Sequence, residues 1–166
     1  EIGQFSEWDE NKEQDWNLLE NPMHKKFHRF MRDLSLVYIN HPALFENDYE
    51  TEGFNWVNCH EEEKCIYVFE RICKDEKILA LFNFSDAYHK GFEVPIEDKT
   101  LEIIMDSSIS EYGGDGKTDY RILIEEYIKY YEKGNKNDHA SIVSSSNRRL
   151  LSIDMRPYSA VYFILK

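Results

Sequence analysis

Apolar residues recur at steps of three and four after residue 21, which is the spacing of one face of an α-helix. The positions that share this face are Met23, Phe27, Phe30, Met31, Leu34, Val37 and Tyr38. Asn21 can cap the helix by accepting a backbone N–H bond, and Pro22 suits the first helical position because its missing N–H would be unpaired there. The pattern predicts an amphipathic helix that ends near Asn40, ahead of Pro42.

After residue 53 the hydrophobic period changes to two, in short runs rich in β-branched and aromatic residues that are separated by polar turns. These runs cover residues 54–57, 66–69, 78–84, 92–96, 101–105, 150–155 and 160–165. Short strands at this spacing are typical of two packed antiparallel sheets. The sequence therefore predicts a mainly β fold, an antiparallel β-sandwich, that follows the helix.

A segment with helical spacing interrupts the series of strands. Its apolar residues are Tyr120, Leu123, Ile124, Tyr127, Ile128 and Tyr131, and Gly134 follows as a C-terminal cap. We expect an inserted helix near residues 119–133, then a long connection over 133–141. The glycine-rich run at 112–116 lacks the Lys-Ser/Thr ending of a phosphate-binding loop and is interpreted as a turn.

Composition and charge indicate which binding partners and which cell compartment to expect for this chain. The 166 residues carry 32 acidic and 20 basic side chains, a net charge of −12, which disfavours nucleic acid and anionic membranes because both bind through Lys and Arg. No run approaches the roughly 18 apolar residues of a membrane span. Cys59, Cys65 and Cys73 show no Cys-x-x-Cys spacing, which favours reduced thiols in a cytoplasmic protein. The first residues lack Met and a signal peptide, so we expect a cut end.

Metal and catalytic motifs have little support in the sequence. His24 and His28 lie one helical turn apart, but the glutamate of a metalloprotease motif and a third ligand at suitable spacing are missing. His60 beside three glutamates is more typical of a hairpin turn than of a metal site. We therefore assign no catalytic residue and no metal ligand.

Aromatic side chains are candidates for sugar contact, because sugar rings present apolar C–H faces to aromatic planes. Trp56 alternates with Phe54 and is expected in the sandwich core. Trp8 and Trp16 lie in the polar segment before the helix, where a large aromatic side chain has less structural reason to occur. They are the better candidates for sugar binding.

Several short motifs follow one another in a distinctive order. They are Glu1-Ile2-Gly3-Gln4-Phe5-Ser6-Glu7-Trp8, Asp15-Trp16-Asn17-Leu18-Leu19, Arg32-Asp33-Leu34, His41-Pro42-Ala43-Leu44, Glu52-Gly53-Phe54-Asn55-Trp56, Phe82-Asn83-Phe84-Ser85, Asp106-Ser107-Ser108, Tyr112-Gly113-Gly114 and Arg156-Pro157-Tyr158-Ser159. In this order they resemble the C-terminal part of bacterial 1,4-alpha-glucan branching enzymes, of the alpha-amylase superfamily. The inserted region at 119–141 departs from the shorter connection that is usual in that family.

The resemblance implies that residues 1–48 are the end of a catalytic (β/α)8 barrel, a loop plus its last helix, and that 49–166 are the all-β C-terminal domain. It implies retaining transglycosylation that forms alpha-1,6 branches in glycogen without a cofactor, by carboxylates on barrel strands outside this chain. The implied partners are alpha-1,4-glucan and the missing barrel. Gln4, Trp8 and Trp16 would then be substrate contacts, since loops at one face of such barrels build the active site.

Two other interpretations stay open from the residues themselves. The chain could be a free-standing carbohydrate-binding module, or a structural β-sandwich that binds no sugar. A further expectation concerns the apolar face of the first helix, from Met23 to Tyr38. Exposing it would cost on the order of 1.5 to 3 kcal/mol per large side chain. We therefore expect the helix either to fold back on the β domain or to pair with a second copy.

Overall fold

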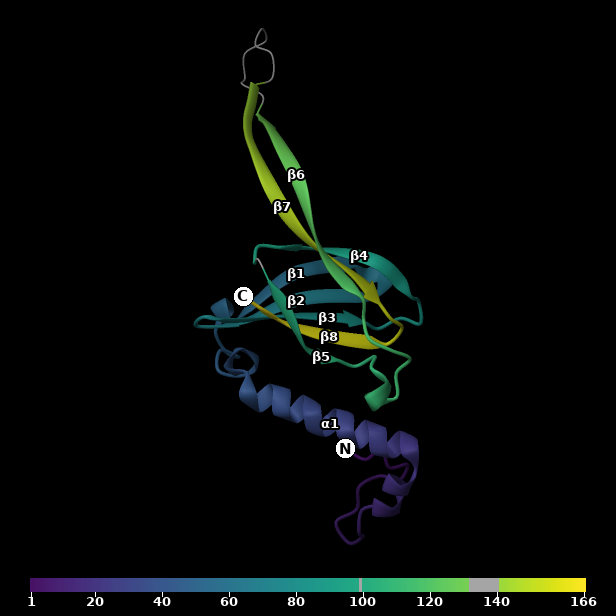
Figure 1. Cartoon of the computed structure of the whole chain (residues 1–166). Helices are drawn as coiled ribbons and strands as arrows, with labels where there is room; N and C mark the ends of the chain where they lie inside the picture. Colours follow the sequence, from purple (N-terminus) through teal and green to yellow (C-terminus); the bar gives the residue numbers. More distant parts are fainter. Residues whose placement is uncertain (99, 132–140) are drawn as a thin grey trace.

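The computed structural model contains two antiparallel sheets packed face to face and one long helix that lies beneath them (Figure 1). It describes residues 1–98, 100–131 and 141–166, and the side chains of all of these except 59–62, 125–131 and 141–147. This arrangement confirms the predicted antiparallel β-sandwich.

The larger sheet has five strands and the smaller has three, with every neighbouring pair antiparallel. The larger sheet runs in the order β1 (Phe54–Glu61), β2 (Ile66–Cys73), β3 (Glu76–Asn83), β8 (Ser159–Leu165) and β5 (Leu101–Asp106). The smaller runs in the order β4 (His89–Ile96), β7 (Ser141–Met155) and β6 (Tyr120–Tyr131). Each of the predicted strand runs lies within or overlaps one of these strands.

Alternation of side chains along the strands places the main core between the two sheets. Along β2, Ile66 and Val68 are fully buried, while Tyr67 and Phe69 point to the opposite face of the sheet. The buried core side chains are Ile66, Val68, Leu79, Leu81, Phe92, Val94, Ile96, Leu151, Ile153, Met155, Val161, Phe163 and Leu165. Each large apolar side chain buried in this way contributes roughly 1.5 to 3 kcal/mol, so this contact zone holds the sandwich together.

The predicted first helix is present as α1 (Pro22–Asn40). The Asn21 side chain accepts the backbone N–H of Met23 at 2.9 Å, and Pro22 occupies the first turn, as the sequence predicted. In the described part of the chain no helix combines the length and apolarity needed to cross a membrane. The short 3-10 helices are η1 (Trp16–Glu20), η2 (Pro42–Leu44), η3 (Thr51–Gly53), η4 (Glu62–Lys64) and η5 (Ser110–Tyr112).

The connection from α1 to β1 is fixed to the larger sheet by one carboxylate. Glu76 accepts the backbone N–H of Ala43 at 2.8 Å with one oxygen and contacts Nδ1 of His41 at 2.7 Å with the other. Arg71 donates to the carbonyl of Ala43 at 3.2 Å. Ala43 is buried in a small second core with Ile78, on the side of the sheet that faces away from the sandwich. The helix is thereby attached to that outer face.

The inserted helix predicted near residues 119–133 is wrong, because residues 120–131 form strand β6. This strand pairs with β7 from Tyr120 opposite Ile153 to Tyr131 opposite Ser141, and the resulting hairpin rises from the body of the sandwich (Figure 1). Residues such as Tyr120, Ile122 and Ile124 have high β-propensity, and the cross-strand ladder satisfies their backbone groups. Most of the predicted connection over 133–141 lies outside the described residues.

We predict that Leu81→Ala lowers the free energy of unfolding by about 2 to 5 kcal/mol, because it leaves a cavity in the inter-sheet core. Urea denaturation followed by circular dichroism measures this. The matched control, Leu36→Ala on the exposed side of α1, should change stability by no more than about 0.5 kcal/mol. Equal losses in the two variants would contradict the assignment of the core.

Candidate functional site

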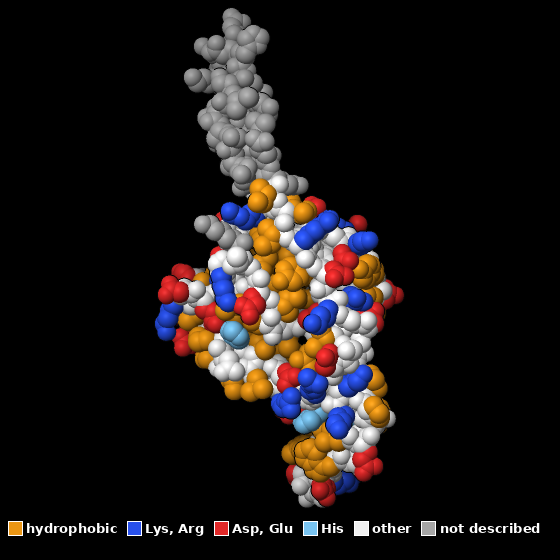
Figure 2. Space-filling view, viewed as in Figure 1, with side chains coloured by type: hydrophobic (Ala, Val, Ile, Leu, Met, Phe, Trp, Pro, Cys, Tyr) orange, Lys and Arg blue, Asp and Glu red, His pale blue; other side chains and the backbone are white. Residues whose placement is uncertain are grey.

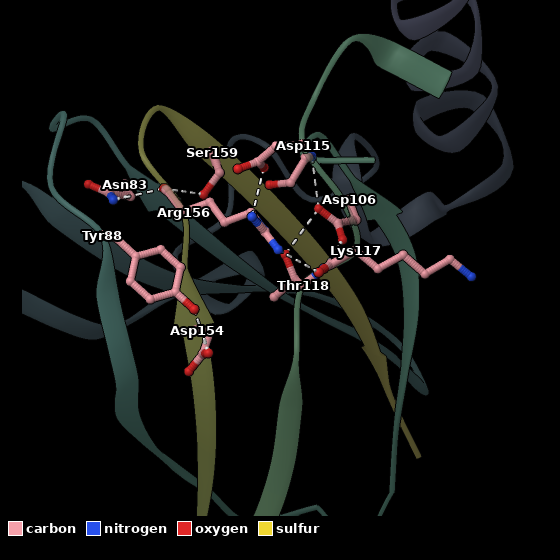
Figure 3. Close-up of polar contacts among 10 residues, drawn as sticks. Asn83, Tyr88, Asp106, Asp115, Lys117, Thr118, Asp154, Arg156 and Ser159 are labelled. Carbon is pink, nitrogen blue, oxygen red and sulfur yellow. Dashed lines mark hydrogen bonds and ion pairs between the residues drawn. The ribbon is translucent and has the colours of Figure 1, made fainter. Parts of the chain in front are cut away.

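Asn83, at the end of β3, joins two loops that lie far apart in the sequence (Figure 3). Its amide nitrogen donates to the carbonyls of Ala87 and Arg156, each at 2.8 Å. Its amide oxygen accepts the backbone N–H of Ser85 at 2.9 Å. Because Asn83 is almost fully buried, these bonds replace water and fix the turn between β7 and β8 to the loop after β3.

The glycine-rich loop is closed by a buried carboxylate in the same region. Asp106 accepts the backbone N–H groups of Ser108 at 2.9 Å and of Thr118 at 2.8 Å. Arg156 reaches across to Asp115 at 2.7 Å, as Figure 3 shows. A Cβ atom on Gly114 would lie 1.9 Å from the carbonyl oxygen of Ser108, so this position requires glycine. The motif residues at this end of the sandwich therefore act as structural joints.

The glycine-rich loop also contacts the helix α1. The Tyr112 hydroxyl donates to Asp33 of α1 at 3.1 Å, and its ring packs edge-on against Phe30 at 5.4 Å between centroids. Burial, together with the hydrogen bond to Asp33, raises the pKa of Tyr112. The helix thus folds back on the β domain, one of the two expected outcomes. Met23 and Phe27 nevertheless remain substantially exposed.

The outer surface of the larger sheet carries a continuous array of aromatic rings, here called the aromatic face. Its members are Phe54, Trp56, Tyr67, Phe69, Phe82, Phe84 and Tyr162. Phe82 stacks on Phe69 and on Phe84, with 5.6 Å between centroids in each case. Aromatic residues alternate here with the aliphatic residues of the core, a signal that the sequence contained.

Trp56 belongs to this face and not to the core, so that prediction is wrong. Its side chain is half exposed and contacts Phe54 at 5.1 Å and Phe69 at 5.7 Å between centroids. The alternation of Phe54 and Trp56 correctly indicated that both lie on one side of β1. Alternation alone does not reveal which side of a strand faces the core.

A cavity of about 690 Å³ lies between α1 and the aromatic face and is here called the helix groove. Leu34, Tyr38 and Ile39 of α1 form one wall, and Phe54 and Phe69 contribute to the other. The lining is mainly apolar. Surface grooves of this size and character are typical of sites that bind another protein surface or an apolar ligand.

The predicted substrate contacts all lie in the segment before α1. Trp8 is 66% exposed and Trp16 is 52% exposed, and Figure 2 shows hydrophobic side chains gathered over this lower part of the molecule. Gln4 is half-buried, and its amide nitrogen donates to the carbonyl of Ser6 at 2.9 Å, while its amide oxygen is buried without a partner. Ser6 also donates to Asp15 at 2.8 Å. No hydrogen bond or ring contact joins the three candidates within the part of the chain that the structure describes.

His24 and Cys73 each have a structural hydrogen-bond partner. Nδ1 of His24 lies 2.8 Å from the carbonyl oxygen of Ile2, which holds the N-terminal segment against α1. Cys65 and Cys73 form no disulfide bond within the described residues, and the side chain of Cys59 lies outside them. Burial, with the neighbouring carboxylate of Glu46, raises the pKa of Cys73. A raised pKa opposes thiolate chemistry.

Tyr88 and Asp154 form a polar pair that sequence reasoning missed. The tyrosine hydroxyl donates to Asp154 at 2.6 Å, and the backbone N–H of Gly91 donates to the other carboxylate oxygen at 2.8 Å (Figure 3). The hydrogen bond from Tyr88 is the main reason that the pKa of Asp154 is lowered below its ordinary value of 3.8. The pairing depends on strand register, so neither residue carried a local signal.

Two antiparallel sheets, joined by loops with fixed polar contacts and preceded by one amphipathic helix, define the class of β-sandwich domains. Comparison with known families agrees. The chain belongs to the family described as the alpha amylase C-terminal all-beta domain, whose profile matches residues 56–166.

Individual proteins similar to this chain are 1,4-alpha-glucan branching enzymes. The chain is 39% identical over 119 residues to the 1,4-alpha-glucan branching enzyme of Aquifex aeolicus, covering 70% of this chain and 19% of that enzyme. It is 35% identical over 116 residues to the branching enzyme of Nitrosomonas eutropha, covering 69% and 16%, and 32% identical over 134 residues to that of Desulfitobacterium hafniense, covering 79% and 21%. The chain thus spans about a fifth of the length of these relatives and is homologous to their C-terminal region, as the motif order predicted.

We predict that Tyr88→Phe reduces the dependence of stability on acid pH. The pKa of Asp154 is lower in the folded chain than in the unfolded one, so its stabilising contribution is complete above about pH 5 and is lost as pH falls through the folded pKa. Removing the Tyr88 hydroxyl raises the pKa of Asp154 in the folded chain toward its ordinary value. Less stability is then lost as the pH falls. Chemical denaturation between about pH 2 and pH 7 measures the effect, with the exposed Tyr158→Phe as control. Identical pH profiles for Tyr88→Phe and the unmodified chain would refute the prediction.

Proposed function

We propose that this chain is the C-terminal part of a 1,4-alpha-glucan branching enzyme and acts as the non-catalytic support of its catalytic barrel. The whole enzyme would break an alpha-1,4 link with retention and transfer the chain to a glucan 6-hydroxyl, so forming an alpha-1,6 branch of glycogen in the cytoplasm. The similarity to branching enzymes across roughly 70% of the chain supports this assignment.

The observation that carries the proposal is the apolar surface formed by the helix groove and the aromatic face. Ile39 in the wall of the groove is 62% exposed, and Phe84 and Trp56 of the aromatic face are at least half exposed. A contiguous apolar surface of this kind is expected to pack against another protein surface. Since the matching relatives have about four-fifths of their length outside the aligned region, we assign the neighbouring barrel as the occupant.

Two acidic side chains that hold the backbone have structural partners, which favours a supporting role over catalysis. Glu76 holds the backbone of Ala43, and Asp106 holds that of Thr118. Retaining glycosyl transfer requires two carboxyl groups about 5 to 5.5 Å apart that face a substrate groove. We place these groups on the barrel, outside this chain.

Gln4, Trp8 and Trp16 remain proposed contacts for glucan. Their support is exposure of two large aromatic rings on the segment that precedes α1, and an amide oxygen of Gln4 left without a protein partner. Within an intact barrel this segment would follow the last barrel strand, at the face where substrate binds.

The proposal is tested by a chimera in which this chain replaces the matching segment of the Aquifex aeolicus branching enzyme. We predict that Ile39→Glu in the chimera lowers its stability by about 3 to 5 kcal/mol and reduces branching, because the charge would be buried against the barrel without a partner. Thermal unfolding and an iodine-staining branching assay measure the two effects.

Ile124→Glu is the matched control, because Ile124 is similarly exposed, at 66%, but lies on β6 of the other sheet. It should leave both readings unchanged. In the isolated chain Ile39→Glu should be nearly neutral, and the chain alone should show no branching. Branching by the isolated chain, or an inert Ile39→Glu in the chimera, would refute the proposal. A concentration-dependent dimer that Ile39→Glu dissociates would instead assign the groove to a second copy.

A second prediction concerns the glucan contacts. In the same chimera, Trp8→Ala should raise KM for amylose about fivefold or more with little change in thermal stability, because an exposed ring stacks on sugar without supporting the core. Phe5→Ala is the control, since Phe5 is also highly exposed in this segment. An unchanged KM in Trp8→Ala would remove Trp8 from the proposed site.

A further inference from the structure

The N-terminal half of α1 contacts two segments that are far apart in the sequence, the N-terminal residues 2–5 and the glycine-rich loop (Figure 1). The N-terminal segment carries Gln4, one of the proposed glucan contacts. The loop belongs to the β domain, and its short helix η5 contacts α1 more extensively than any strand does. One helix therefore connects the β domain to a segment that is proposed to bind substrate.

The N-terminal segment is held closely on α1. Nδ1 of His24 lies 2.8 Å from the carbonyl oxygen of Ile2, so its N–H donates to that carbonyl, and the side chain of Ile2 is buried. Gly3 has a φ of +67°, which favours glycine, and a Cβ atom there would lie 3.5 Å from Nδ1 of His24. Gln4 follows directly after these two residues, so its position depends on the position of the helix.

The glycine-rich loop contacts the same part of the helix. The bond from Tyr112 to Asp33 and the packing of the Tyr112 ring on Phe30 join the loop to α1. Phe30 in turn stacks on Phe27, with 6.4 Å between ring centroids. The Phe27 ring lies 3.5 Å from the place that a Cβ atom on Gly3 would occupy. A continuous series of contacts thus runs from Tyr112 to Gly3.

Both sides of the contact between Tyr112 and the helix are fixed. Arg32 donates to one carboxylate oxygen of Asp33 at 2.8 Å, and the other oxygen accepts the hydroxyl of Tyr112. The backbone of Gly113, with a φ of +98°, lies against the helix, since a Cβ atom there would be 2.9 Å from Cε of Met23. The loop therefore meets the helix directly, and a displacement of the loop would displace the helix.

The side-chain amide of Gln4 shows what this positioning can serve. Its nitrogen donates to the carbonyl of Ser6, while its buried oxygen has no partner among the described residues. A buried acceptor without a partner is unfavourable until a donor reaches it. Glucose hydroxyls are such donors. An acceptor that is already fixed in place binds them more tightly, because less conformational freedom is lost on binding.

We propose that Tyr112 is a positioning residue for substrate. Through Asp33 and Phe30 it fixes α1, and α1 fixes the segment that carries Gln4. The consequence for glucan rests on the proposed function, whereas the coupling between the loop and the N-terminal segment does not. The β-sandwich thus takes part in substrate binding indirectly, by orienting a segment that lies before α1.

The coupling is tested by NMR of the 166-residue chain and its Tyr112→Ala and Tyr112→Phe variants. We expect Tyr112→Ala to shift the backbone amide signals of Gly3 and Gln4 and the ring nitrogen signals of His24, although no described hydrogen bond or ring contact joins these residues to Tyr112. Tyr112→Phe keeps the ring and should cause smaller shifts in the same direction. Tyr158→Phe, at an exposed tyrosine, should cause none. Circular dichroism melts verify that each variant is folded.

The consequence for substrate is tested in the chimera. Tyr112→Ala should raise KM for amylose about threefold or more with little change in kcat, and Tyr112→Phe should raise it less. In a Gln4→Ala background, Tyr112→Ala should add little to KM, because both changes act through the same contact. A purely structural role of Tyr112 would instead lower stability and kcat and would add to the effect of Gln4→Ala.

Three results would overturn the inference. They are unchanged Gly3 and Gln4 signals in folded Tyr112→Ala, an unchanged KM in the same variant of the chimera, and fully additive effects of Tyr112→Ala and Gln4→Ala on KM. The NMR result does not depend on branching activity, so the two proposals fail separately. A chimera that shows no branching, while Tyr112→Ala still shifts the Gln4 signal, contradicts the proposed function and leaves the coupling in place.

Discussion

The two-sided character of the larger sheet is the constraint on which the other features depend. Along β2 and β3, aliphatic side chains such as Val68 and Leu81 face the smaller sheet, and aromatic side chains such as Phe69 and Phe82 face outward. A shift of one residue in register would exchange these faces and place bulky rings in a core that is filled by aliphatic residues. Packing between the sheets thus fixes the register, and the register in turn creates the aromatic face.

The outward face then determines where the helix lies. The connection after α1 is held on that face by Glu76, and the Tyr112 loop supports the other part of the helix. Both contacts are hydrogen bonds, and the ring of Tyr112 also packs against Phe30. No residue of α1 is fully buried, and Met23, Tyr38 and Ile39 remain exposed and available to a partner such as the proposed barrel.

The sequence was informative wherever a pattern was local. Alternating runs between polar turns gave the β-strands of the predicted sandwich, and Asn21 with Pro22 gave the start of α1. Residues 120–131 were misassigned because apolar spacing there fits both periods, and only pairing with β7 decides between them. Contacts such as Tyr88 with Asp154, or Gly91 above Ser152, depend on register between distant strands. A single sequence carries no signal for such contacts.

The side-chain amide of Asn83 is a position where deamidation would disrupt the domain. Hydrolysis of its side-chain amide would replace the nitrogen that donates to Ala87 and Arg156 by an oxygen, and two attractive contacts would become repulsive. Spontaneous deamidation requires access for water, which the buried position of Asn83 prevents. The packing of the two loops therefore protects the amide of Asn83 that holds them together. If the loops opened locally, water would reach the amide, and its deamidation would permanently remove the hydrogen bonds to Ala87 and Arg156.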